Sequence, residues 1–479
     1  MTQHWRLDPD RALPADPATR SLARTIYDHA AALPLVSMHG HVDVTLFTGN
    51  RPFPDPAQLL ITPDHYLVRM LVSQGYRHAD LGVRYRAGVA DEVVPVEQNP
   101  RTIWRRFCEN WHLFRGTPTR YWLEHELAEI FHLPAPPSAS NADALYDRLA
   151  ELLQREDFRP LALLDRMNVE VLATTDSALA DLADHAQLER QLGRGRIIPT
   201  FRPDSLLHLD QPGWVSEVEQ LAVVAGTDTG DYAGFLAALR SRRRAFIDAG
   251  ARATDHGHVS ADTTPLAAAD AARIYRDALA GEVRANDAAA FAAHMLFQMA
   301  EMSAEDGLVM QLHPGVLRNH NTEVHRLHGP DQGFDIPVRV EFTRGLRPVL
   351  DRFGLSAGFR CILFTTDETV YSRELAPLAG AYPSVRLGAP WWFLDSPEQM
   401  RRFRESAVET AGFYNTSGFV DDTRAFASIP ARHDLSRRID AGYLARLVAE
   451  GRLPLDEALD TMADLAYRLP LTAYAAAHH

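Results

Sequence analysis

Short apolar segments of strand length recur along the chain, and each ends in polar or glycine-rich residues. The eight segments are Leu35–Met38, Val169–Thr174, Ile197–Phe201, Ala249–Thr254, Leu308–Leu312, Cys361–Thr365, Val385–Leu387 and Gly418–Asp421. Most are apolar throughout rather than alternating, which is typical of parallel strands buried on both faces. The fourth and seventh segments give the weakest signal, because glycine and alanine dilute it.

Segments with helical periodicity lie between several of these strands. Clear examples are Asp270–Met302, Glu398–Ala411 and Leu435–Ala449. Eight strands that alternate with helices are described more economically by a closed barrel than by a doubly wound sheet. The pattern therefore predicts an α/β fold, a (β/α)8 barrel of the TIM type over residues 35–479, after an N-terminal helical segment at 1–34.

The stretch between the first two strands is far longer than a simple crossover needs. It contains probable helices at Pro63–Ser73, Thr102–Trp111, Tyr121–Phe131 and Asn141–Arg155. We predict that residues 60–160 form a helical insertion over the C-terminal mouth of the barrel. The alternative is a mere packing appendage, but loops at that face more often serve function.

Charge and composition narrow the function. The 479 residues include 49 basic and 63 acidic side chains, a net charge of −14, and every basic residue is arginine. The absence of lysine excludes a Schiff-base lysine, a phosphate-loop lysine and a carbamylated lysine that bridges two metals. Acidic balance and scattered arginines argue against nucleic acid as a partner.

Cysteine content and hydropathy indicate the compartment. Cys108 and Cys361 are too few for a disulfide framework or a cysteine-rich zinc site. The N-terminus lacks the apolar run of a signal peptide, and no apolar stretch is long enough to span a membrane. We expect a soluble cytoplasmic protein with no membrane partner.

The pair His39 and His41, separated by Gly40, ends the first predicted strand. Because side chains alternate along a strand, both imidazoles point the same way. Two imidazoles at the carboxyl end of a strand form half of a divalent-metal site. The pair by itself is a weak signal in a chain with 21 histidines, and its position at a barrel strand end strengthens it.

Other strand ends supply further ligands. His313 closes the fifth strand, and Asp421 and Asp422 close the eighth. In a barrel these ends converge on the face that carries the active site. Two histidines, one aspartate and an open position make a catalytic metal site. One of the two aspartates has the alternative role of a loop cap, and spacing does not say which.

Two histidine motifs stay ambiguous. His256, after the fourth strand, is either a ligand or proton-transfer group, or part of a polar turn that Asp255 stabilises. Asp64 is a plausible helix cap in the insertion. His65 and Tyr66, which follow it, gain a role only if the fold places them at the barrel mouth.

Arginine and tryptophan side chains could recognise an acidic sugar-sized ligand. Arg202 follows the third strand and Arg318 follows His313. Arginine binds a carboxylate with two parallel hydrogen bonds, although a structural ion pair is the alternative for each. Trp391-Trp392-Phe393 would give an apolar wall, or is ordinary core. We include Trp392 among the expected substrate contacts.

Together these motifs resemble the uronate isomerase (glucuronate isomerase) family, a branch of the amidohydrolase superfamily. The similar segments are Met38–Val42, Thr62–Tyr66, Tyr121–Leu127, Val171–Asp176, Ile198–Asp204, Ala253–Gly257, Val309–Asn321, Gly329–Asp335, Leu387–Asp395 and Val420–Phe426. They occur in the family's order and span most of the chain. The segments at 198–204, 309–321 and 387–395 carry the family-specific elements, whereas the whole superfamily shares the histidine pair.

The resemblance implies residue roles. It makes His39, His41 and Asp422 the metal ligands, with Asp422 preferred to Asp421 because it fits the family's Asp-Ser-Arg element. It places His313 at or beside the metal and lets Arg202 and Arg318 hold the sugar acid. The catalytic residues that it implies are His65, Tyr66, Asp422 and Arg424.

The implied reaction is the aldose–ketose isomerisation of D-glucuronate to D-fructuronate, or of D-galacturonate to D-tagaturonate. One divalent ion, zinc or alternatively manganese, would stabilise an enediolate. Either Tyr66 or Asp422 would move the proton from C2 to C1. The expected partners are a small-molecule sugar acid and further copies of the chain in a homo-oligomer.

Several positions depart from the family pattern and leave room for other functions. Ser37 stands where the family usually has an acidic residue, Gly40 where cysteine is common, and Asp421 where threonine is usual. Val42-Asp43 takes the place of Leu-Ser, and His320 stands where asparagine is usual. The sixth strand ends in Thr365-Thr366-Asp367 without histidine, as in uronate isomerases. One alternative is a metal-dependent hydrolase of a carboxylate-bearing lactone or amide. Another is a metal-free protein that only binds sugar acids.

Overall fold

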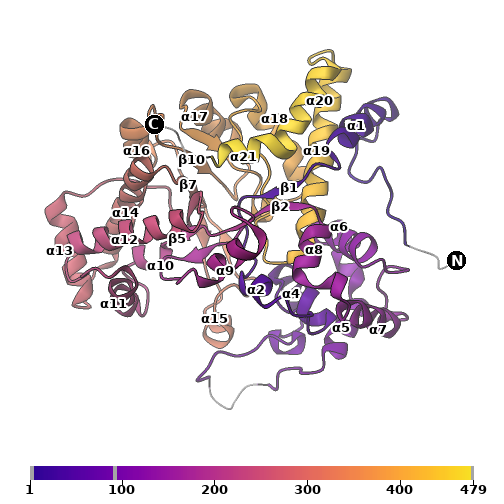
Figure 1. Ribbon diagram of the computed structural model, residues 1–479, viewed down its shortest axis with the longest axis horizontal. Helices are drawn as coiled ribbons and strands as arrows, with labels where there is room; N and C mark the ends of the chain where they lie inside the picture. The colour runs from indigo at the N-terminus through magenta and orange to yellow at the C-terminus, as the bar shows by residue number, and fades with distance from the viewer. Residues whose placement is uncertain (1–4, 90–93, 476–479) are drawn as a thin grey trace.

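The computed structural model describes residues 5–89 and 94–475 (Figure 1). Parallel strands at its centre form two sheets. One contains β1 (Leu35–Ser37), β2 (Val169–Ala173) and β4 (Ile197–Ile198). The other contains β3 (Asp176–Ser177), β5 (Phe201–Arg202), β6 (Ala253–His256), β7 (Val309–Leu312), β10 (Cys361–Leu363) and β11 (Val385–Leu387). Thr174 and Thr175 connect β2 to β3, so the two sheets are successive parts of one ring.

The ring is completed by irregular backbone between β11 and β1. Leu387 forms a parallel bridge with Thr416, and the Asp422 amide donates to the His39 carbonyl at 3.2 Å. The eighth predicted strand, Gly418–Asp421, therefore occupies its barrel position without regular strand geometry. Gly418 has a φ of +75°, and a Cβ atom there would lie 2.5 Å from Pro470. This close packing prevents a regular extended strand.

Two predicted boundaries were wrong. The fourth strand runs from Ala253 to His256 rather than over Ala249–Thr254, because α12 (Tyr232–Asp248) ends only at residue 248 and a turn follows. The predicted helix Asp270–Met302 is two helices, α13 (Ala268–Leu279) and α14 (Ala285–Asp306). Gly281, with a φ of +76°, lies at the break.

Helices surround the ring of strands. This layer comprises α9 (Ala183–Leu192), α10 (Asp204–Leu207), α11 (Trp214–Ala225), α16 (Arg347–Phe353), α17 (Ala376–Ala381) and α18 (Pro397–Ala411), besides α12 to α14. The N-terminal helix α1 (Pro17–Ala30) packs on two helices from the C-terminal part of the chain, α19 (Ile429–Ala449) and α20 (Leu455–Ala463) (Figure 1). None of the described helices is both long and apolar enough to cross a membrane.

The insertion after β1 is helical. Its helices are α2 (Thr45–Gly49), α3 (Pro56–Leu60), α4 (His65–Val72), α5 (Pro100–Glu109), α6 (Pro118–His125), α7 (Ala142–Leu153) and α8 (Pro160–Arg166). They lie together beside the strands (Figure 1) around a core that includes Trp104, Phe107 and Leu149. Each of the four predicted helices has a counterpart here, with ends that differ by a few residues.

An apolar layer closes one end of the barrel and leaves polar side chains at the other. One buried residue from each of six strands contributes to this layer: Val36, Val171, Ile198, Ala253, Val309 and Ile362. Two residues further along β6 and β7, the same alternation directs Asp255 and Gln311 inward. Tyr474 supports the layer and donates a hydrogen bond to Gln311 Oε1 at 2.7 Å. Polar groups therefore gather only at the carboxyl ends of the strands.

Candidate active site and metal centre

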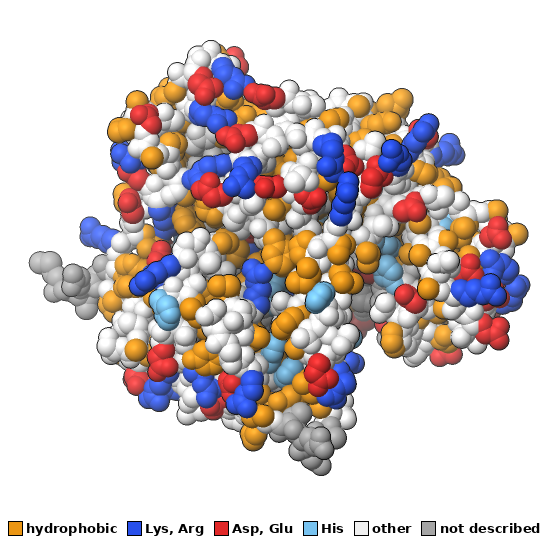
Figure 2. Space-filling view, turned by 180° about the vertical axis from the view of Figure 1, so that it is seen from behind, with side chains coloured by type: hydrophobic (Ala, Val, Ile, Leu, Met, Phe, Trp, Pro, Cys, Tyr) orange, Lys and Arg blue, Asp and Glu red, His pale blue; other side chains and the backbone are white. Residues whose placement is uncertain are grey.

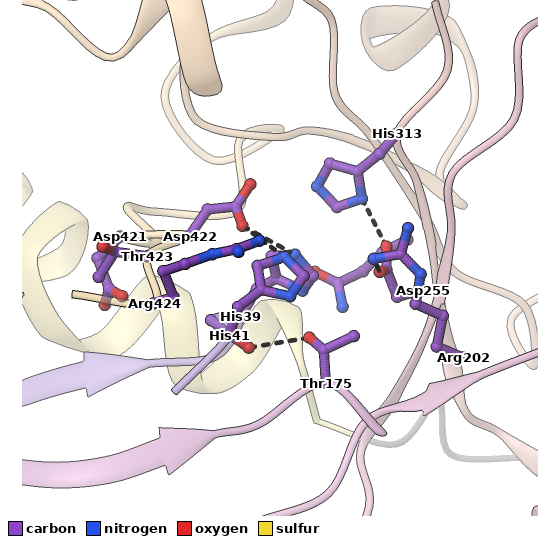
Figure 3. Close-up of polar contacts among 12 residues, drawn as sticks. His39, His41, Thr175, Arg202, Asp255, His313, Asp421, Asp422, Thr423 and Arg424 are labelled. Atoms are coloured by element: carbon purple, nitrogen blue, oxygen red, sulfur yellow. Dashed lines mark hydrogen bonds and ion pairs between the residues drawn. The ribbon is translucent and has the colours of Figure 1, made fainter. Parts of the chain in front are cut away.

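The carboxyl ends of the strands and the loops beyond them enclose a cavity of about 290 Å³. Strand ends and the segment after residue 420 contribute His39, His41, Arg202, Asp255, His313, Asp422 and Arg424. Helix α4 and the loops contribute His65, Tyr66, Arg318, Asp331, Trp391 and Trp392. Figure 3 shows the strand-end residues converging on one space. The volume suits a small polar molecule.

His39, His41 and Asp422 form a candidate metal centre. The Oδ1 atom of Asp422 lies 3.0 Å from Nε2 of His41 and 3.4 Å from Nε2 of His39. Burial alone would raise the pKa of Asp422, but the two imidazoles hold that pKa well below its ordinary value. Two imidazole nitrogens, one carboxylate and an open side toward the cavity match a catalytic zinc site. The donor set fits a divalent cation.

A second group of possible ligands shares His39 with the first and adds Asp255 and His313. Both oxygens of Asp255 are already engaged: Oδ1 lies 2.7 Å from Nδ1 of His313, and Oδ2 lies 3.0 Å from Arg202. The His313 ring stacks on His39 with centroids 4.6 Å apart. Its buried Nε2 atom has no hydrogen-bond partner among the described residues. His313 is therefore set to bind an oxygen in the cavity.

Three arginines surround the rest of the cavity, and each is held by carboxylates. Arg202 contacts Asp204 and Asp255 at 2.9 and 3.0 Å. Arg318 contacts Asp335 at 3.1 Å and lies 5.0 Å from the centre of a Trp392 ring. The Arg424 guanidinium lies 3.1 Å from Asp331. Ion pairing and a role in ligand binding are thus compatible for Arg202 and Arg318, because the same side chains line the cavity.

Helix α4 brings His65 and Tyr66 to the cavity. Asp64 caps this helix, accepting the Tyr66 amide at 2.8 Å, which is the role predicted for it. Burial lowers the pKa of His65 to about 3, so its ring is neutral. Burial also raises the pKa of Tyr66, although nearby Arg432 acts in the opposite direction. Both groups are uncharged hydrogen-bonding partners at neutral pH.

The fold separates neighbouring candidates that the sequence left together. Asp255 lines the cavity, whereas His256 does not and accepts or donates a hydrogen bond with Thr254 Oγ1 at 2.9 Å. Asp422 lines the cavity, whereas buried Asp421 pairs with His433 at 3.1 Å. Trp392 lines the cavity beside His65.

Sequence reasoning gave no role to several cavity residues. Asp331 binds Arg424 and also lies 3.8 Å from Arg318, so one carboxylate lies between two arginines of the cavity. Asp255, considered only as a turn stabiliser, orients both His313 and Arg202. The alternation from buried Ala253 to Asp255 is the signal that could have identified it.

Known proteins provide independent comparisons. The glucuronate isomerase family matches residues 18–472. The uronate isomerase of Rhizobium meliloti (strain 1021) is 52% identical over 468 residues, which are 98% of this chain and 99% of that protein. The uronate isomerase of Phenylobacterium zucineum (strain HLK1) is 50% identical over 474 residues, covering 99% and 98% of the two chains.

Solved structures agree. The crystal structure of glucuronate isomerase from Caulobacter crescentus superimposes with a TM-score of 0.94 at 48% identity, covering 98% of this chain and 97% of that one. The uronate isomerase from Thermotoga maritima gives a TM-score of 0.88 at 27% identity, covering 98% and 100%. These similarities confirm the predicted fold class and the family resemblance that was inferred from the sequence motifs.

Proposed function

The chain belongs to the glucuronate isomerase family, and from that premise we propose that this cavity isomerises a hexuronate with a divalent cation held by His39, His41 and Asp422. The enzyme is an isomerase of hexuronates, which sets aside the hydrolase and the binding-protein alternatives. One observation carries the proposal for the site. Two imidazole nitrogens meet a single Asp422 oxygen at a cavity that is also lined by Arg202, Arg318 and Arg424.

The arginines supply the recognition of a sugar acid. A uronate carries a carboxylate at C6, far from the reacting C1 and C2 atoms. Arg318 and Arg424 share Asp331 as a counter-ion, and this carboxylate is 41% exposed at the cavity. A substrate carboxylate would take bidentate hydrogen bonds from one of these guanidinium groups. Trp392 keeps Arg318 in place through its stacked ring.

We expect the polar groups around His39 to contact the C1 and C2 end of the sugar, where the reaction takes place. A divalent cation, which we propose to be zinc, would supply stabilisation for negative charge that develops on the C1 and C2 oxygens. The Nε2 atom of His313 is free to hydrogen-bond one of these oxygens. Asp255 fixes that ring through Nδ1 and so determines which nitrogen faces the substrate.

Aldose-to-ketose conversion moves the carbon-bound proton from C2 to C1 and the hydroxyl proton from O2 to O1, and leaves the atom count unchanged. Two groups at the cavity can carry the carbon-bound proton, the phenol oxygen of Tyr66 and the carboxylate of Asp422. Asp422 is an anion because its pKa is low, whereas Tyr66 is a neutral phenol. Tyr66→Phe, which keeps the proposed metal ligands, should separate the two: it abolishes C2 proton exchange with solvent only if Tyr66 is the base.

A panel of hexuronates tests the proposed function. Zinc-loaded protein should interconvert glucuronate or galacturonate with the corresponding ketose, followed by NMR of the anomeric region. An apoprotein prepared with chelator should be inactive and regain turnover when zinc or manganese is added. Absence of turnover with every hexuronate after metal loading would refute the proposal.

Two organisational proposals accompany this function. We infer that residues 60–160 cover the mouth of the barrel, which is supported by the position of His65 and Tyr66 in the cavity. Assembly into a homo-oligomer and action in the cytoplasm remain predictions. Light scattering of the purified protein tests the first of these two.

A further inference from the structure

A second cluster of metal-ligating side chains lies outside the active-site cavity, on the other face of β6. It consists of Asp204 at the start of α10, and of His256 and His258 at the end of β6. One ligand atom from each lies within 4.8 Å of the other two. None of the three residues lines the cavity that holds His39 and Asp422.

The cluster leaves three buried polar atoms without a partner. Nδ1 of His256, Nε2 of His258 and Oδ1 of Asp204 make no hydrogen bond to any described residue. The two histidines are 0% and 4% exposed. Buried polar atoms are normally paired, so three unpaired atoms that face one another require a common partner. The separation of 4.0 Å between His258 Nε2 and Asp204 Oδ1 is too long for a direct hydrogen bond.

We propose that Asp204, His256 and His258 bind a second divalent cation, of the zinc type. Two neutral imidazoles and one carboxylate oxygen are ligands that zinc prefers. Tetrahedral zinc with bonds of about 2.0–2.2 Å places its ligands roughly 3.3 Å apart. A contraction of up to about 1.5 Å within the cluster therefore brings these atoms into coordination distance. His208, half-buried with its ring centroid 4.6 Å from that of His258, is the nearest candidate for the fourth position.

The remaining polar atoms of His256 and Asp204 are fixed by second contacts, as in known zinc sites. Nε2 of His256 pairs with Thr254 Oγ1, which leaves Nδ1 for the metal. The other oxygen of Asp204 accepts hydrogen bonds from Arg202 Nε and from the Gly257 amide, both at 2.9 Å. His256 and Asp204 are thus oriented before any ion binds.

Nearby positive charge does not prevent binding. Arg202 and Arg243 are the arginines that face the cluster. Arg202 lies between Asp204 and Asp255, and Arg243 is paired with Asp306 at 2.6 Å. Each guanidinium therefore has its own carboxylate, and Asp204 still has one free oxygen.

The proposed site would fasten two loops of the barrel together. It joins the loop after the third strand to the loop after the fourth, next to Gly257, where a Cβ atom would lie 2.8 Å from Arg202. Through Asp204 it would hold Arg202 at the edge of the cavity. Its role is therefore positional, whereas the cation at His39 and His41 faces the substrate.

Metal stoichiometry tests the proposal without reference to activity. Protein stripped with chelator, reloaded with Zn²⁺ and desalted should contain two zinc ions per chain by mass spectrometry of the metal. His258→Ala should contain one, Asp422→Asn should contain one, and the double variant none. His294→Gln is the matched control. His294 is buried, and both of its ring nitrogens are already within hydrogen-bond distance of a partner, Tyr232 and Leu266, so this variant should keep two.

Native mass spectrometry of the unaltered protein covers the case in which a variant fails to fold. Binding of two Zn²⁺ ions in succession to the folded chain supports the second site. In a separate titration with Co²⁺ in place of Zn²⁺, the second ion should add a second absorption band. A single zinc per wild-type chain at saturation overturns it, and so does His258→Ala protein that still binds two. Neither result depends on turnover, so failure here is separate from failure of the isomerase proposal.

Discussion

Asp255 holds His313 and Arg202 at once: Oδ1 lies 2.7 Å from Nδ1 of His313, and Oδ2 lies 3.0 Å from the Arg202 guanidinium. Burial alone would raise the pKa of Asp255, but Arg202 and His313 keep that pKa well below its ordinary value. One buried carboxylate therefore fixes both a histidine beside the candidate metal centre and an arginine of the cavity wall.

Removal of this carboxylate charge should impair catalysis without loss of the fold. We expect Asp255→Asn to lower kcat/KM by about 10- to 100-fold, because the His313 tautomer and the Arg202 position are both released. Steady-state kinetics with the preferred hexuronate measure this effect. Unchanged kinetics would show that Asp255 has a purely structural role. Asp262→Asn, at an exposed position, is the control.

Removal of a metal ligand should abolish both metal binding and turnover. His39→Ala leaves Asp422 with a single imidazole neighbour. We expect the metal bound at this site to be lost and kcat to fall by at least about 100-fold. Metal analysis and kinetics on the same preparation check the result. His29→Ala, on the exposed side of α1, should behave as wild type. Wild-type turnover by a metal-free His39→Ala protein would contradict the assigned site.

If Arg318 binds the substrate carboxylate, its substitution should change substrate binding rather than the chemical step. Arg318→Lys keeps the charge but loses the planar group that lies over Trp392 and contacts Asp335. KM should rise by roughly 10-fold while kcat changes little. Arg326→Lys, on the exposed α15 (Thr322–His328), is the matched substitution. An unchanged KM would show that Arg318 forms only a structural ion pair and does not bind the substrate.

Acid should destabilise the fold through buried neutral histidines. Burial lowers the pKa of His294 to about 4, below its unfolded value of 6.5. The neutral ring is the folded form, so its contribution to stability is complete above pH 6.5 and is lost as the pH falls toward 4. His294→Gln should flatten the pH dependence of the free energy of unfolding in that window, measured by urea denaturation at several pH values. An identical slope in the variant would exclude His294 as a contributor.

Asp434 should fasten the N-terminal helix to the C-terminal part of the chain. Its carboxylate accepts hydrogen bonds from Tyr27 in α1, from Tyr121 at 3.0 Å and from Arg11 at 2.9 Å. Asp434→Ala leaves buried cationic and phenolic groups unpaired, and we expect a loss of about 3 kcal/mol in the free energy of unfolding. Chemical denaturation measures it. Asp28→Ala, on the exposed face of α1, should have little effect, and a similar loss in both variants would argue against a specific role.

The surface carries mixed charge despite the acidic balance of the chain. Figure 2 shows arginine and acidic side chains interspersed over the face that it presents. Many of them pair over short sequence distances, such as Arg326 with Glu323 and Arg401 with Glu398. On the face shown, positive and negative side chains are therefore mixed.

Local patterns determined the class of the fold and the residue types of the site. Continuous apolar segments between amphipathic helices predict parallel strands buried on both faces, and eight of them favour a barrel over a doubly wound sheet. Glycine interrupts the apolar pattern at Gly281 and near Gly418. The helix predicted at the first position and the strand predicted at the second both differ from the elements in the structure. At Gly418 a backbone with φ of +75° lies against Pro470, a contact that comes from the distant end of the chain.

The sequence by itself identified the His39 and His41 pair and the absence of lysine, which excludes a carbamate-bridged pair of metals. Only the tertiary structure decided which of two adjacent residues faces the cavity. Asp255 turns inward and His256 outward because β6 ends two residues later than the sequence suggested, so both residues belong to the strand, and side chains alternate along it. Asp422 reaches His41 because its backbone adopts a φ of +42° while its amide bonds to the His39 carbonyl. Register and backbone angles of this kind are set by packing between segments far apart in the chain, so they follow from the folded molecule and not from local sequence.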